Sequence, residues 1–146
     1  MSGRVDVLHG VNLDTLGRRD PAHYGELTLT ELEVKVKRFA DELELDVAFF
    51  QTNHEGQFCE WLHRSGETSG GLVLNPGAWT HYSYAIRDAL DVAGLPAVEV
   101  LLSAIDEREE WRRTSVIRDL CLACVQGKGA DGYREALEML KEALAR

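Results

Sequence analysis

The chain has 146 residues, of which 45% are hydrophobic and 28% charged, values typical of one globular domain with a buried core. Its formal net charge of −9 argues against nucleic acid and anionic membranes as partners, although a local arginine cluster can still attract a small anionic substrate. No apolar run approaches the length of a membrane span and MSGRVDVLHG is not a signal peptide, so the three cysteines predict reduced thiols and a cytoplasmic location.

Strand-like apolar runs alternate with helical patterns along the chain. The first run, RVDVLHG at 4–10, predicts a strand, and the segment 27–44 predicts a helix because its apolar residues recur with helical spacing. Thr28, followed three residues later by Glu31, predicts a capping box at the start of that helix. The apolar stripe of the helix consists of Leu29, Leu32, Val36, Phe39 and Leu43.

The remaining segments continue this alternation. Further strands are predicted at 45–51, 71–75, 97–102 and 120–127, and further helices at 56–66, 83–94 and 132–146. The last helix carries an apolar stripe of Tyr133, Leu137, Leu140 and Leu144. Short strands that alternate with helices indicate a parallel sheet covered on both faces. We therefore expect an α/β, flavodoxin-like, doubly wound sandwich with a five-stranded parallel sheet, in a single domain that spans 1–146.

In such a fold the site lies beyond the carboxyl ends of the strands, near the point where the strand order reverses. Polar segments follow the first four predicted strands: HGVNLDTLGRRDPAHYG at 9–25, TNHEG at 52–56, NPGAWTH at 75–81 and SAIDEREEWRR at 103–113. Because these ends meet at one edge of a parallel sheet, the segments converge and predict a polar site there.

The segment 17–25 carries Arg18, Arg19 and Tyr24 between glycines, and its length suits a mobile lid. An isolated tyrosine has a pKa of about 10, too high for a base at neutral pH, but neighbouring cations favour the phenolate. The same residues also fit a surface tyrosine beside solvated arginines, and this segment alone does not decide between the two interpretations.

Two asparagines end neighbouring strands of the predicted sheet. Asn12 follows the first strand, and Asn75 ends a buried strand before the sharp turn at Pro76 and Gly77. A single asparagine in such a place is commonly a turn former. Two of them, with His81 and several arginines nearby, predict a polar site that fits a small ring.

Glu99 poses a separate question, because it lies two residues before Leu101 on the predicted strand 97–102. Side chains two apart on a strand face the same side of the sheet. A buried carboxylate is costly without a partner, and leucine cannot provide one. The sequence therefore leaves the partner of Glu99 open.

Other motifs carry less weight. GKGADG at 127–132 matches a dinucleotide-binding fingerprint, but no second strand follows to carry the ribose-binding acid, so a tight turn is the better interpretation. Cys121 and Cys124 form a C-x-x-C without a second pair, which predicts buried, inert thiols on the fifth strand. The histidines lack metal-ligand spacing, and the G-x-S-x-G of serine hydrolases is absent.

Taken together, these segments resemble one enzyme family. VLHGVNLDTLGRRDPAHYG, FFQTNHEG, LVLNPGAWTH, AIRDAL, VEVLLSAIDEREEWRR and GKGADGYREALEML are similar, in order and spacing, to type II 3-dehydroquinate dehydratases. The resemblance covers nearly the whole chain. It implies flavodoxin-like subunits that assemble as trimers and then as dodecamers, and that remove water from 3-dehydroquinate, a small cyclic keto acid, with no cofactor and no metal.

The resemblance also implies roles for individual residues. Tyr24 takes a proton beside the ring ketone, while Arg19 and Arg108 favour its phenolate. Asn12 helps to hold a water that stabilises the enolate. The implied substrate-binding residues are Asn75, His81 and Arg112 for ring hydroxyls, Leu102 and Ser103 for the carboxylate, and Asp88 from a neighbouring subunit.

One implied role has no residue to fill it. In the family a histidine protonates the leaving hydroxyl, and a glutamate that matches Glu99 orients it, but Leu101 stands at the position of that histidine. Other departures occur around the same site, at His9, Val11, Asp14, Trp79, Tyr82, Tyr84 and Ala104.

These departures leave three hypotheses. The chain is a lyase or isomerase that acts on a related cyclic keto acid, or it is a slow 3-dehydroquinate dehydratase in which Glu99 donates a proton through water. Alternatively, it is a non-catalytic or ligand-binding paralogue that kept the fold and the assembly. The intact Arg19 and Tyr24 of the lid favour a lyase.

Overall fold

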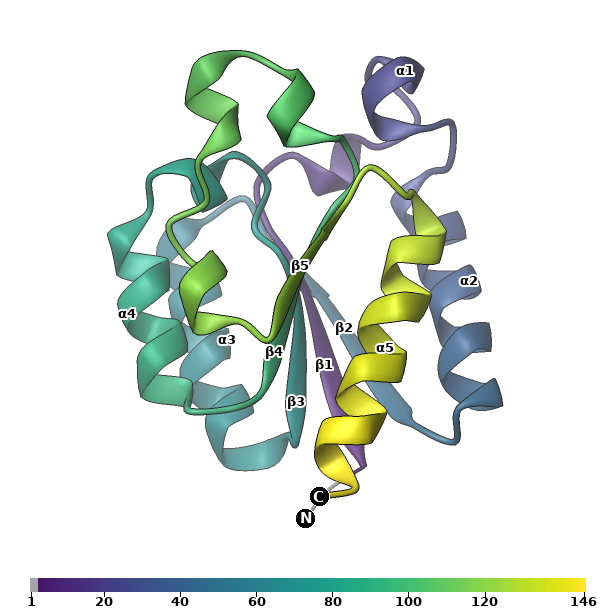
Figure 1. The fold of residues 1–146 in the computed structure, drawn as a ribbon, viewed down its shortest axis with the longest axis vertical. Coiled ribbons are helices and arrows are strands. Elements are labelled where there is room, and N and C mark those ends of the chain that lie inside the picture. The colour runs from purple at the N-terminus through teal and green to yellow at the C-terminus, as the bar shows by residue number, and fades with distance from the viewer. Residues whose placement is uncertain (1–2) are drawn as a thin grey trace.

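A computed structural model describes residues 3–146 and contains a five-stranded parallel sheet of order β2-β1-β3-β4-β5 (Figure 1). This is the strand order of flavodoxin-like doubly wound folds, so the predicted fold class is confirmed. The strands are β1 (Arg4–His9), β2 (Asp46–Gln51), β3 (Gly71–Asn75), β4 (Ala97–Leu101) and β5 (Ala123–Gln126).

Helices cover both faces of the sheet (Figure 1). On one face α2 (Leu29–Glu42) and α5 (Ala130–Leu144) pack on strand valines such as Val7 and Val73. On the other face α3 (Glu55–Thr68) and α4 (Tyr84–Ala93) pack on Leu72 and Leu74. Because both faces are covered, β1 and β3 are buried along most of their length.

The helix boundaries follow the local signals in the sequence. The capping box at the start of α2 is present, because the Thr28 hydroxyl accepts from the Glu31 amide and the Glu31 carboxylate accepts from the Thr28 amide. Gly94, with a left-handed φ of 65°, ends α4. Within residues 3–146 no helix has both the length and the apolar character needed to cross a membrane.

The fifth strand differs from its prediction. It begins at Ala123 rather than Leu120, because Arg118–Leu120 form a 3-10 turn before the chain joins the sheet. Cys121 therefore lies outside the strand that contains Cys124, and burial raises the pKa of each thiol to about 12. Both cysteines are free, and no group of three or more metal-ligating side chains occurs in the described part of the chain.

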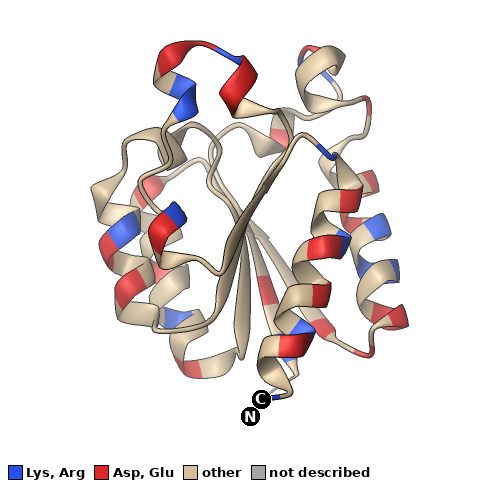
Figure 2. Cartoon of the chain, in the orientation of Figure 1, with Lys and Arg blue, Asp and Glu red and all other residues tan. Residues whose placement is uncertain are grey.

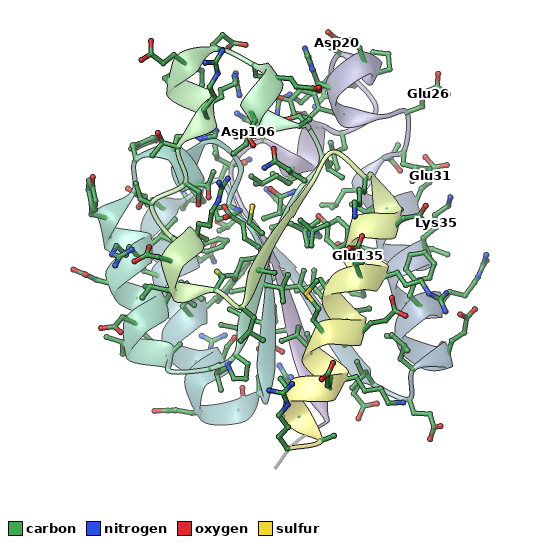
Figure 3. All side chains as sticks on the ribbon, in the orientation of Figure 1. Asp20, Glu26, Glu31, Lys35, Asp106 and Glu135 are labelled. Carbon is green, nitrogen blue, oxygen red and sulfur yellow. The ribbon has the colours of Figure 1, made fainter. Side chains whose placement is uncertain are left out.

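The predicted lid contains a short helix of its own, α1 (Pro21–Tyr24). The Asp20 carboxylate accepts from the Ala22 amide and begins this helix, and proline is well suited to its first position. The lid and the segment after β4 stand at the same end of the molecule, where Figure 3 labels Asp20 on the first and Asp106 on the second. Figure 2 shows charged residues on these segments and on the helices, while the strands carry few.

Candidate active site

A pocket of about 600 Å³, counting its open mouth, lies beyond the carboxyl ends of β1, β3 and β4. The structure brings most of the sequence-predicted residues to its wall, together with four that sequence reasoning did not single out. The wall consists of Asn12, Leu13, Arg19, Tyr24, Asn75, Gly77, Ala78, His81, Leu101, Leu102, Ser103, Ile105, Arg108 and Arg112.

Two glycines allow the segments after β1 and β3 to cross in close contact. A Cβ atom on Gly10 would lie 2.1 Å from the Pro76 carbonyl oxygen, and one on Gly77 would lie 2.4 Å from the Val11 carbonyl oxygen. Both distances are far below van der Waals contact, so only glycine fits at these crossings. The close approach places Asn12 and the residues around Gly77 on the same pocket wall.

Asn12 is held in an unusual backbone conformation. Its φ of 69° lies in the left-handed region, which asparagine adopts more readily than most residues. Its amide donates to Asn53 Oδ1 at 2.8 Å, and its carbonyl accepts from the Thr15 hydroxyl at 2.6 Å. These bonds fix the backbone at the pocket wall and leave the Asn12 side-chain amide available to a ligand.

The Asn75 side chain is oriented from beneath the pocket. Its Nδ2 donates to the Tyr133 hydroxyl at 3.3 Å, and its Oδ1 accepts from the Gly77 amide at 3.3 Å. The Tyr133 hydroxyl also lies 2.9 Å from Nε2 of His9, and all three side chains are buried. Burial lowers the pKa of His9 to about 4 and raises that of Tyr133, so both are neutral at pH 7.

The Tyr24 hydroxyl is the centre of a cationic cluster at the mouth of the pocket. Arg19 Nη2 donates to it at 3.0 Å and Arg108 Nη1 at 2.6 Å. The Arg19 guanidinium also stacks over the Tyr24 ring, with its Cζ 3.9 Å from the ring centroid. Two positive groups that donate to one phenolic oxygen stabilise negative charge on that oxygen.

Further cations and a hydroxyl line the wall formed by the segment after β4. Arg108 Nη1 also donates to the Ser103 hydroxyl at 3.3 Å, and its side chain is only 9% exposed. Arg112 donates to the Glu109 carboxylate at 2.8 Å and stacks over Trp111. With Arg19 across the pocket, this wall suits an anionic ligand despite the acidic charge of the chain.

His81 lines the pocket from the 3-10 helix η2 (Gly77–His81). Its Nδ1 lies 2.7 Å from the Thr114 carbonyl oxygen, and Trp111 packs edge-on against its ring with centroids 5.3 Å apart. Because a carbonyl oxygen can only accept, Nδ1 carries a proton in this bond. Burial lowers the pKa of His81, and the bond to Thr114 opposes that change.

Glu99 lies below the pocket rather than in its wall. It is fully buried, and both carboxylate oxygens accept hydrogen bonds from hydroxyl groups. The Ser115 hydroxyl is 2.8 Å from one oxygen and 2.9 Å from the other, and the Thr80 hydroxyl donates to the second. The partners of the carboxylate are therefore two hydroxyls from distant segments, which the spacing of Glu99 and Leu101 did not reveal.

Asp88 is the other predicted site residue that is absent from this wall. It is exposed on α4, where the resemblance would have it serve a neighbouring subunit. The four wall residues that sequence reasoning missed, Leu13, Gly77, Ala78 and Ile105, lie within the polar segments that it had identified, but they carry no reactive group. Their positions depend on how the segments cross, and no local signal reports that.

Comparisons with known proteins agree with this geometry. The family model for class II dehydroquinases matches residues 3–141. Among curated proteins, a 3-dehydroquinate dehydratase from Deinococcus radiodurans is 48% identical over 139 residues, which cover 94% of this chain and 97% of that protein. One from Bacillus pumilus is 46% identical over 134 residues, covering 92% of this chain and 91% of that protein.

A solved structure is also similar to this chain in fold and sequence. The type II dehydroquinase from Propionibacterium acnes superposes with a TM-score of 0.92 at 39% identity, over 97% of this chain and 98% of that one. Fold and sequence thus agree over almost the full length. The chain belongs to the class II dehydroquinase family.

Proposed function

We propose that the chain is a carbon–oxygen lyase of the 3-dehydroquinate dehydratase type, which starts its reaction by removing a proton beside a ring ketone. The curated relatives carry that name, and the pocket combines cations with uncharged polar groups, as a hydroxylated cyclic keto acid requires. The observation that carries the proposal is the Tyr24 oxygen, which accepts hydrogen bonds from both Arg19 and Arg108 at the pocket mouth.

In the first half of the reaction, the Tyr24 phenolate takes the carbon-bound proton and leaves an enolate. The two guanidinium groups stabilise the phenolate before the transfer. Asn12, whose side-chain amide faces the pocket from a rigid backbone, helps to hold a water that stabilises the enolate oxygen. These groups are on the wall before substrate arrives, which lowers the cost of organising the charged intermediate.

The remaining polar groups of the pocket wall orient the substrate. The carboxylate binds at Ser103 and the neighbouring backbone at Leu102, beside Arg108. Ring hydroxyls bind Asn75, His81 and Arg112. Asp88 completes the site from a neighbouring subunit, since it is exposed on α4 and outside the pocket of its own chain.

The second half of the reaction expels a hydroxyl, and an expelled hydroxide requires a proton. Leu101 lines the pocket and has none to give. General acid catalysis typically accelerates such steps by roughly 10²–10⁴-fold, about 3–5 kcal/mol. Unless another residue supplies the proton, water loss is slowed by a factor of that order relative to the acid-assisted step.

Leu101 also favours a second candidate function. An apolar side chain where the family has its acid fits a ligand-binding paralogue, or a lyase for a related keto acid whose leaving group needs no acid. The paralogue would bind the ring acid without enolising it. Exchange of the carbon-bound hydrogen separates this candidate from the lyase.

The test follows 3-dehydroquinate in heavy water. Deuterium entry into the ring reports enolisation, and the absorbance of the conjugated enone reports water loss. We expect deuterium entry with the wild-type chain and a loss of at least 100-fold in Tyr24→Phe. His63→Gln, at an exposed position on α3 and outside the pocket wall, is the control and keeps the wild-type rate.

The alternative outcomes assign the other functions. Saturable binding without exchange or enone indicates the paralogue, and absence of all signals, binding included, indicates a different substrate. Either result contradicts dehydratase chemistry on 3-dehydroquinate. An unchanged exchange rate in Tyr24→Phe contradicts the assignment of the base.

A further inference from the structure

The pocket contains one side chain that can deliver a proton near neutral pH and that the first half-reaction leaves unused. Among the wall residues, His81 carries the only imidazole within the part of the chain described, residues 3–146. A guanidinium is a poor proton donor at neutral pH, and Tyr24 is occupied as the base. An ordinary histidine titrates between pH 5 and 8, the range suited to a general acid.

The orientation of the His81 ring leaves one defined nitrogen for the ligand. Nδ1 is bound at 2.7 Å to the Thr114 carbonyl oxygen, which requires a proton on Nδ1 in either charge state of the ring. Nε2 is therefore the nitrogen that gains and loses a proton. Within residues 3–146 it makes no hydrogen bond, and so it is available to a molecule in the pocket.

Glu99 holds together the two segments that carry His81 and Thr114. It accepts from the hydroxyls of Thr80 and Ser115, the chain neighbours of His81 and Thr114 respectively. The Val116 amide also donates to the Thr80 carbonyl oxygen at 2.8 Å, so the two segments are joined again beside the same pair. One buried carboxylate thus fixes the segments that carry the two ends of the His81–Thr114 bond.

This arrangement also puts His81 close to the position of the missing acid. Glu99 and Leu101 share one face of β4, and the Thr80 hydroxyl reaches Glu99 on that face. His81 follows Thr80 in the chain, and both His81 and Leu101 line the pocket. The imidazole therefore faces the cavity on the same side of the sheet as the lost acid.

We infer that His81 donates the proton for water loss, with Glu99 as its positioning residue; this rests on the proposed dehydratase function. The enolate electron pair restores the ring ketone and forms the carbon–carbon double bond while the carbon–oxygen bond to the neighbouring hydroxyl breaks. The Nε2–H proton of His81 moves to that oxygen, which leaves as water. His81 becomes neutral. Before the next turnover Tyr24 releases its proton to solvent and His81 takes one up from solvent.

Burial is the main cause that lowers the pKa of His81, and the hydrogen bond to the Thr114 carbonyl opposes it. Arg112 and Arg108, from the segment after β4, lower the pKa further, while Glu99 on β4 raises it. The result is a ring that releases its proton more readily than a solvent-exposed histidine, and a bound carboxylate helps to offset the cationic neighbours.

The experiment measures how the enolate partitions in heavy water. Each enolate either takes up deuterium and returns to substrate or loses the hydroxyl and becomes enone. In His81→Gln we expect enone formation to fall at least 100-fold, while the ratio of exchange to elimination rises at least tenfold. His63→Gln, at an exposed position on α3, is the matched control and leaves the ratio unchanged.

A rescue variant makes the test specific for proton donation. Adding Leu101→His to His81→Gln returns an imidazole to the same face of β4, and enone formation should recover at least tenfold. His81→Asn replaces the glutamine variant if that chain does not fold. A parallel fall of exchange and elimination, with no change in their ratio, assigns His81 to binding alone and overturns the inference, as does wild-type exchange without any enone. A wild-type chain that neither exchanges nor eliminates overturns the proposed function itself.

Discussion

Glu99 illustrates how a single buried side chain acquires its role. A fully buried carboxylate is tolerated only when its oxygens are hydrogen-bonded, and here two hydroxyls, those of Thr80 and Ser115, meet that requirement. Neither donor is near Glu99 in sequence. The carboxylate thereby joins the segment after β3 to the segment after the η4 turn (Glu110–Arg113), and it does so beneath His81.

Glu99→Gln tests whether these hydrogen bonds position His81. An amide keeps the size of the side chain but replaces one carboxylate oxygen by an NH2 donor, so at least one of the three hydroxyl contacts must break or reverse its direction. We expect the ratio of exchange to elimination to rise about three- to tenfold through misplacement of His81, with a smaller effect than His81→Gln. The control is Glu60→Gln, at an exposed position on α3, measured in the same deuterium assay. An unchanged partition ratio in Glu99→Gln would contradict the positioning role.

His9 is the second residue whose burial has a measurable consequence. It is wholly buried against Tyr133, its Nδ1 has no hydrogen-bond partner within residues 3–146, and burial lowers its pKa from 6.5 to about 4. The folded chain therefore holds His9 neutral, whereas the unfolded chain protonates it near its ordinary pKa. Between these two values the unfolded state binds more protons than the folded state.

Acidification should therefore destabilise the fold through His9. The free energy of unfolding is unaffected by His9 above pH 6.5 and falls as the pH decreases from 6.5 to about 4. The full loss is about 3 kcal/mol for a pKa difference of this size. Urea unfolding of wild type and His9→Asn at pH 7.5 and 4.5 measures it, because the variant lacks this titration. Equal losses in both chains would show that His9 does not carry the effect.

At the scale of elements, the lid is a loop whose two flanking segments contact each other at the start of α2. A Cβ atom on Gly17 would lie 3.1 Å from Cγ2 of Thr28, so the two ends of the lid meet. Thr28 is also the first residue of the capping box that begins α2. The element that carries Arg19 and Tyr24 is thus anchored by helix capping, while α1 adds local order at its tip.

Thr28→Ala tests the base of the lid. Loss of the hydroxyl leaves the Glu31 amide without its cap, and we expect the free energy of unfolding to fall by about 1 kcal/mol. Thr30→Ala, at an exposed position in the first turn of α2, is the matched control and should leave stability unchanged or slightly raised because alanine favours helix. Urea unfolding at pH 7.5 compares the chains, and equal stability of Thr28→Ala and wild type would contradict the cap.

At the scale of the whole molecule, the pocket of one chain is open and lacks one of the residues that the resemblance assigns to it. Asp88 is exposed on α4, and large apolar side chains are exposed nearby on the same helix and before it, at Tyr82, Tyr84 and Val92. This surface fits the predicted trimeric association, in which one subunit completes the site of the next.

Mixing two inactive variants tests this association. Tyr24→Phe chains keep Asp88, and Asp88→Asn chains keep Tyr24. If Asp88 serves a neighbouring site, random co-assembly of equal amounts creates intact sites in about a quarter of the pockets, and enone formation recovers accordingly. Sedimentation of the wild-type chain gives the assembly mass. Absence of recovery from mixed assemblies would place Asp88 outside the neighbour's site, and a monomeric mass would contradict association.

The fold and the lid were accessible from sequence because their signals are local. Apolar periodicity predicted the five strands and the helices α2 to α5, and the capping box predicted the start of α2, whereas the short α1 within the lid was not predicted. The fifth strand was predicted too long because a run of apolar residues does not distinguish a strand from the tight 3-10 turn at Arg118–Leu120. The local spacing indicated one half of the Tyr24 cluster, because Arg19 lies five residues from Tyr24. It did not indicate the contact with Arg108, which lies 84 residues away.

The amino-acid sequence by itself determined the alternation of strands and helices, the strand-end location of the polar segments and the presence of Leu101 where the resemblance implies an acid histidine. Only the tertiary structure decided what Glu99 holds and which way His81 turns, because those bonds join segments 16 to 33 residues apart. Periodicity reports which residues a segment buries, whereas a hydrogen bond between distant segments depends on how their loops cross. The close contacts at Gly10 and Gly77 set how the segments after β1 and β3 cross, and the bonds of Glu99 and His81 set how the segment after β3 meets residues 114–115.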